Sequence, residues 1–127
     1  MFLMKSTTSG ASLCFSERSA EYFNVTIETP NLTATKKVCI YDYASSNSFV
    51  DFFQRIALNT RPWAGEDVWE TLEGEMRLRA TCDALGHVRF EITLRDYSLD
   101  WSLVCSMLFD FGMLPQHAAD AGRFMAQ

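Results

Sequence analysis

The sequence predicts an α+β fold in which one antiparallel sheet of about six strands packs against two α-helices. Residues 74–109 alternate between apolar and polar side chains, as strands with one buried face do. Two other segments repeat apolar residues at helical spacing, and the order along the chain is strands, helix, strands, helix. A chain of 127 residues can bury one core, so a single domain over residues 1–127 is expected.

The first third of the chain predicts three strands. Each is a run rich in β-branched and aromatic residues that ends at a turn. The expected strands cover residues 11–17, 21–29 and 33–42. Residues 1–10 are mostly small and polar after the first four, and this composition suggests a frayed end.

A helix is expected to begin at Ser48. Ser48 and Asp51 form a Ser-x-x-Asp capping signal, and phenylalanines follow at helical spacing. The helix should end before Pro62, because the residue preceding a proline avoids helical geometry. A second helix is expected around Pro115, a residue that the first helical turn tolerates, with His117 on its solvent side.

The register of one hairpin follows from residues 74–83 and 87–96. Directly opposed residues in an antiparallel pair share a face, so their two numbers must sum to an even value. A loop of Ala84-Leu85-Gly86 meets this condition and supplies the glycine that such a turn favours. Asp83 should then lie opposite His87, with all the apolar residues on one face.

The same register pairs opposite charges on the polar face. Arg79 falls opposite Glu91, and Glu75 falls opposite Arg95. Each such pair contributes about 0.2–1 kcal/mol across a ladder. A shift by one residue would bury this charged row and expose the apolar one, so the register is well specified.

A third strand is expected from Asp100 to Phe109. If Arg95 faces Asp100, then Leu94 meets Trp101 on the core side. The opposite face of this strand carries valine and leucine and is not cleanly polar. Either another part of the chain covers that face or a partner does.

Composition excludes several classes of protein. Nearly half of the residues are hydrophobic, which argues against disorder, and no segment has the length of a transmembrane helix or the apolar core of a signal peptide. We therefore expect a cytoplasmic protein that contacts no membrane. The four cysteines are scattered singly and the two histidines stand apart, so no metal site or cofactor is expected. The net charge of −5 disfavours nucleic acid.

Acidic residues cluster before the hairpin turn with no basic residue between them. This segment contains the residues that we expect to bind a partner: Trp63, Glu66, Asp67, Glu70 and Glu73. A tryptophan beside carboxylates is typical of an interface, where an apolar anchor sits inside a charged rim. A solvated acidic edge is the alternative explanation of the carboxylates, and the tryptophan could instead cap the core.

The chain resembles a family of small bacterial proteins of unknown function over residues 46–127. The resemblance rests on Trp63-x-Gly65, on Trp69-x-Thr71-Leu72-Glu73-Gly74 and on Gly86-His87-Val88, followed by a helical tail. It implies the fold and gives no active site. In size and charge the chain is also similar to immunity proteins, which neutralise a toxin made by the same bacterium.

Three functions remain open. The leading hypothesis is a non-enzymatic, immunity-type protein that presents its acidic segment to the basic cleft of a cognate toxin. The second is a small enzyme that uses Asp83 to orient His87 as a general base, although no catalytic motif accompanies the pair. The third is a structural protein that self-associates, as a homodimer for example, through Val104 and Leu108 or through an exposed edge strand.

Overall fold

The computed structural model describes residues 1–40 and 43–127, and the side chains of all of these except 43–47. Within these ranges the chain forms two four-stranded antiparallel sheets, two α-helices and one short 3-10 helix. Their bounds are β1 (Phe2–Lys5), β2 (Ser12–Ser16), β3 (Tyr22–Glu28), β4 (Thr33–Cys39), α1 (Tyr43–Ala57), β5 (Glu66–Glu70), β6 (Met76–Cys82), β7 (His87–Asp96), β8 (Trp101–Asp110), η1 (Phe111–Met113) and α2 (Leu114–Met125).

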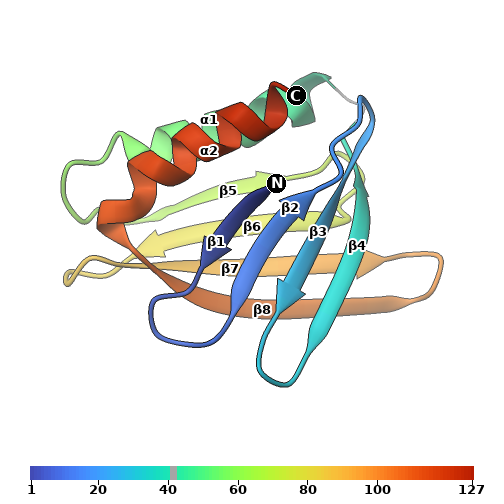
Figure 1. Cartoon of the computed structure of the whole chain (residues 1–127). Helices are drawn as coiled ribbons and strands as arrows, with labels where there is room; N and C mark the ends of the chain where they lie inside the picture. Colours follow the sequence, from blue (N-terminus) through green and yellow to red (C-terminus); the bar gives the residue numbers. More distant parts are fainter. Residues whose placement is uncertain (41–42) are drawn as a thin grey trace.

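The fold is α+β, as predicted, but with two sheets rather than one. Strands β1 to β4 form the first sheet and β5 to β8 form the second, each in the order of the chain. The strands of the two sheets cross one another, and the two helices lie side by side, with α1 against β5 and α2 against β1 (Figure 1). The expected count of about six strands falls short because β1 and β5 carry too few residues for a clear alternating pattern.

One apolar core joins both sheets and both helices. The inward side chains of β2, β3, β6 and β7 are fully buried, which is the period-two pattern of strands that share one core. Phe49 of α1 lies at its centre, with ring centroids 5.0 Å from Phe15, 5.3 Å from Phe23 and 5.1 Å from Trp69. This one side chain therefore ties α1 to both sheets.

The structure confirms the register of the β6–β7 hairpin. Met76 pairs with Leu94, and Ala80 pairs with Phe90. The amide of Asp83 donates to the carbonyl of His87 at 3.1 Å, which closes the ladder at the turn. A single clean alternation and a turn with one glycine at positive φ were sufficient to define this pairing.

The predicted register of β7 and β8 is wrong by two residues. Leu94 pairs with Leu103 rather than Trp101, and Asp96 pairs with Trp101. The turn therefore holds residues 97–100 instead of 96–99, because Asp96 stays in the strand and accepts hydrogen bonds from the amides of Ser98 and Leu99. A shift of two leaves every side chain on its predicted face.

The N-terminal residues form an edge strand where the sequence suggested a frayed end. Phe2 and Met4 of β1 are buried, and β1 pairs with β2. The loop that follows contacts the second sheet, where the amide of Thr7 donates to the carbonyl of Leu108 at 3.1 Å. Two apolar side chains at alternate positions thus fix a segment that composition alone indicated to be mobile.

The first helix begins at Tyr43, earlier than predicted, so Ser48 is not its N-cap. The Ser48 hydroxyl accepts a hydrogen bond from the indole nitrogen of Trp69 at 2.9 Å. The strand expected over residues 33–42 ends at Cys39, and residues 41 and 42 lie outside the described part of the chain.

Candidate functional site

The predicted partner-binding residues lie along β5 and the turns at its two ends. Side chains alternate along this strand, so Glu66 and Glu70 lie on the outer face of the second sheet while Asp67 and Trp69 face inward. Glu73 follows in the turn to β6. The acids therefore divide between two faces and do not form one continuous surface.

Three of these acids pair with arginines that the sequence places far away. Asp67 accepts from Nε of Arg55 in α1 at 2.9 Å. Glu66 pairs with Arg79 of β6, and Glu70 lies 4.0 Å from Arg95 of β7. The cluster lacks bases along the chain, but neighbouring elements supply them in space. Such half-exposed pairs contribute little stability, yet they partly neutralise the acidic surface.

Trp63 lies at the opposite end of β5 from Glu70 and Glu73. Its ring is half-buried and packs against Phe111, with the centroids 6.2 Å apart. Its indole nitrogen is buried and has no hydrogen-bond partner among the described residues. Five strand residues separate the two ends, about 13 Å at the usual rise. The structure thus does not bring Trp63 together with Glu70 and Glu73.

The turn between β5 and β6 lies beside the turn between β7 and β8. Gly74 has φ +74°, a conformation that favours glycine, and its carbonyl accepts from the Tyr97 hydroxyl at 3.4 Å. Large apolar side chains are exposed on both turns: 69% of Leu72, 65% of Tyr97 and 72% of Leu99. We call residues 71–74 and 97–100 the turn pair. Sequence reasoning did not identify Leu72 and Tyr97 as exposed apolar side chains.

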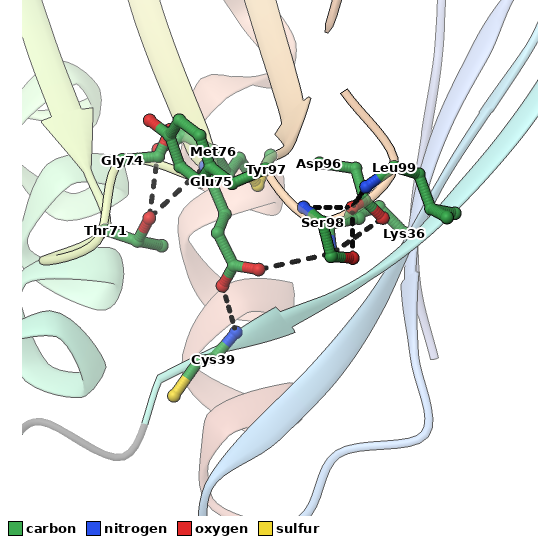
Figure 2. A network of polar contacts seen from close by, with 10 residues as sticks. All are labelled: Lys36, Cys39, Thr71, Gly74, Glu75, Met76, Asp96, Tyr97, Ser98 and Leu99. Carbon is green, nitrogen blue, oxygen red and sulfur yellow. Dashed lines mark hydrogen bonds and ion pairs between the residues drawn. The ribbon is translucent and has the colours of Figure 1, made fainter. Parts of the chain in front are cut away.

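A charged network lies behind the turn pair and joins the two sheets (Figure 2). The ammonium of Lys36 in β4 lies 3.2 Å from Glu75 and 3.4 Å from Asp96, and all three side chains are at most 16% exposed. The other oxygen of Glu75 accepts from the amide of Cys39 at 3.1 Å. Glu75 therefore binds the first sheet, and the predicted side-chain pair with Arg95 is wrong, although their backbones are opposed.

The network shifts the pKa of two of its members. Burial disfavours the charged form of Lys36, but its hydrogen bonds and ionic contacts with Glu75 and Asp96 outweigh burial and raise its pKa. The pKa of Asp96 is lowered, first by the hydrogen bond from the Leu99 amide and then by that from the Ser98 hydroxyl. Ala34, Lys36 and Val38 share the inner face of β4, and this alternation is the signal that could have revealed an inward lysine.

Asp83 and His87 form the pair that the hairpin register predicts. One carboxylate oxygen of Asp83 accepts from the amides of Leu85 and His87, both at 2.9 Å, and caps the turn. The other oxygen lies 2.9 Å from Nδ1 of His87. These bonds lower the pKa of Asp83, the His87 amide contributing most. Both side chains are about half exposed.

His87 also borders a cleft of about 560 Å³. Thr7, Thr8 and Asp110 line the same cleft. The Asp83 carboxylate can orient the His87 imidazole as a general base. The Thr7 hydroxyl is engaged elsewhere, because it donates to the Leu108 carbonyl at 3.5 Å. The described part of the cleft supplies a base without an activated nucleophile.

His117 is buried, contrary to the prediction that it faces solvent. It is 5% exposed and packs against Phe2 and Phe109, at centroid distances of 6.4 and 5.9 Å. Its Nδ1 atom has no hydrogen-bond partner in the described part of the structure. Burial lowers the pKa of His117, and the nearby charge of Asp120 opposes this only weakly.

The four cysteines are free and partly buried. Burial raises the pKa of Cys14, Cys82 and Cys105, which makes their thiolates less available. Among the described residues no group of three or more histidine, cysteine or acidic side chains could hold a metal ion. Within the same residues, neither helix is long and apolar enough to cross a membrane.

Fold and site together define a single α+β protein with two crossed meander sheets, an exposed pair of turns and an Asp-His pair beside a cleft. The chain belongs to the family of unknown function DUF6228, whose family model matches residues 4–127. The match includes the N-terminal strands, which lie outside the resemblance over residues 46–127. No curated protein matches the chain.

Proposed function

We propose that the protein is a non-enzymatic binding protein that contacts a basic protein partner through the turn pair. The observation that carries the proposal is the exposure of Leu72, Tyr97 and Leu99 on two adjacent turns. Single exposed apolar residues are ordinary, whereas several on neighbouring turns are typical of an interaction surface. The hydrogen bond from Tyr97 to Gly74 holds the two turns together before any partner arrives.

The charge beside these side chains favours a basic partner. Glu73 and Asp100 are exposed, and neither has an ion pair among the described residues. Glu66, Asp67 and Glu70 instead hold arginines and must exchange them to bind a new base. Glu73 therefore becomes the leading acid of the predicted set. Trp63 is the weakest member because its ring already packs against Phe111.

The finer proposal is an immunity-type protein that neutralises a cognate toxin in the bacterial cytoplasm. Such a toxin would present a basic cleft, and acidic groups around an apolar anchor complement that surface. The net charge of −5 and the small single domain are consistent with this role. Electrostatic attraction should speed association and make the on-rate fall with added salt.

The test is partner capture from the native bacterial lysate at low and high salt, with wild-type protein and matched variants as bait. Leu72→Ser and Glu73→Lys should each lose the partner while keeping the wild-type melting curve. Glu28→Lys is the control, since it makes the same charge change at an exposed position on the first sheet. Equal capture by Glu73→Lys and Glu28→Lys would exclude the turn pair as the contact surface.

A small enzyme is the second candidate function. The observation in its favour is the 2.9 Å contact between Asp83 and Nδ1 of His87 at the edge of the 560 Å³ cleft. A ligand of this cleft should move the NMR signals of the His87 ring, and Asp83→Asn should weaken that response. His87 ring signals that respond to no member of a small-molecule library would count against catalysis at this pair.

A further inference from the structure

Strand β8 is the outer strand of the second sheet, and the β1–β2 loop protects its outer edge from pairing at Leu108. It runs from Trp101 to Asp110 and pairs with β7 on one side (Figure 1). Residues 101–109 contain no charged residue, proline or glycine. Edge strands usually carry charges, prolines or bulges that block a further strand. A long neutral edge is the pattern that accepts one.

The backbone groups that face outward on β8 can be identified. The Leu108 carbonyl accepts from the Thr7 amide at 3.1 Å and from the Ser6 hydroxyl at 2.9 Å, so it points away from β7. Alternate residues of an antiparallel strand point the same way, and Ser102, Val104 and Ser106 therefore direct their N–H and C=O groups outward. Among the described residues, only the β1–β2 loop forms hydrogen bonds with this edge.

We propose that β8 pairs antiparallel with β8 of a second copy of the chain, which joins two second sheets into one continuous sheet. An antiparallel strand that pairs with itself is self-complementary, because the same residues read in reverse on the partner. Around Val104, Ser102 of one copy faces Ser106 of the other, and all the outward backbone groups meet. The pairing buries no charge, which is why a second copy fits better than the basic partner proposed for the turn pair.

The surroundings of the edge limit the pairing and support it. Thr7 occupies the position beside Leu108, so the new ladder should span residues 101–107. An apolar groove of about 270 Å³ lies along the start of the strand, between Trp101 and Leu103 on one side and Leu32 and Ala34 on the other. The added strand can place an inward-facing apolar side chain there. Val104, which is 61% exposed, would then be covered.

The test is sedimentation equilibrium over a wide range of concentration. Wild-type protein should show a reversible monomer–dimer equilibrium, and the amide exchange of Val104 should slow as concentration rises. Val104→Pro should remain monomeric, because proline removes one outward N–H and keeps the hydrogen bonds to β7. Val104→Thr keeps the N–H and the branched side chain, so it should dimerise within about threefold of wild type.

Val104→Lys guards against misfolding of the proline variant. Position 104 is exposed in the single chain, so a lysine should fold there, yet it would face its own copy across the dimer axis. This variant should also be monomeric. A wild-type protein that stays monomeric at every concentration, or a folded Val104→Lys that dimerises like wild type, would overturn the proposal. The turn pair is untouched by these variants, so its test is independent.

Discussion

Protonation of His117 is expected to destabilise the fold as the pH falls. The imidazole is buried against Phe2 and Phe109, and burial lowers its pKa in the folded state. His117 lines a small cavity of about 260 Å³, and Lys5, Asp110 and Asp120 line it as well. Asp120 is the carboxylate that favours the charged imidazole, but its effect is weaker than that of burial.

The magnitude follows from proton linkage. The unfolded chain binds a proton at His117 with an ordinary pKa of about 6.5, whereas the folded chain binds it only at lower pH. Unfolding therefore takes up a proton between these two values. The contribution of His117 to stability is full above about pH 6.5 and is lost at up to about 1.4 kcal/mol per pH unit below it, until the folded pKa is reached.

Urea unfolding between about pH 5 and pH 8 measures this effect. His117→Phe should flatten the dependence, because phenylalanine fits between the two neighbouring rings and carries no titrating group. The Nδ1 atom has no partner in the described structure, so the variant loses no hydrogen bond there. His87 is unchanged and cancels in the difference between the two proteins. Identical slopes for wild type and His117→Phe would refute the reasoning, as would an NMR pKa of His117 at or above 6.5.

Three further outcomes are expected. Lys36→Met should lower the melting temperature more than Lys37→Met does, because it leaves Glu75 and Asp96 without their shared cation. The exposed ammonium of Lys37 lies over the Tyr22 ring, so its loss leaves no carboxylate unpaired, and equal melting shifts would contradict this. Phe49→Ala should lower the free energy of unfolding in urea by about 3–5 kcal/mol, because it leaves a cavity among the rings of both sheets. A decrease below about 1 kcal/mol would argue against the central position of Phe49. Gly74→Ala should lower the free energy of thermal unfolding by about 1 kcal/mol or more. The φ angle of Gly74 is +74°, and the added carbon would lie 3.1 Å from the Tyr97 hydroxyl, so an unchanged melting curve would contradict this.

The sequence was sufficient where a local pattern determined the structure. The β6–β7 register is correct because one alternation and one three-residue loop left no alternative pairing. The β7–β8 register could not be obtained in the same way. Asp100 adopts φ +53° and Asp96 caps the turn, and both features move the four-residue loop one residue along the chain without leaving a glycine as a signal.

The candidate site was less predictable because its contacts are long-range. The arginines that pair with Glu66, Asp67 and Glu70 come from three different elements. The absence of basic residues along the acidic segment therefore did not predict that arginines lie beside these acids in the folded chain. The exposure of Leu72 and Tyr97 was also hidden, since neither residue stands out in sequence until the two turns are known to touch.

The meander order of both sheets has a consequence for the folding rate. Every strand pairs with its neighbour in the chain, so each ladder can close over a short loop at low entropic cost. Distant contacts, such as Lys36 with Glu75 and Thr7 with Leu108, form only when the two sheets dock. Refolding should therefore be faster than in sandwiches whose strands pair across long connections, and docking of the sheets should be the slow step.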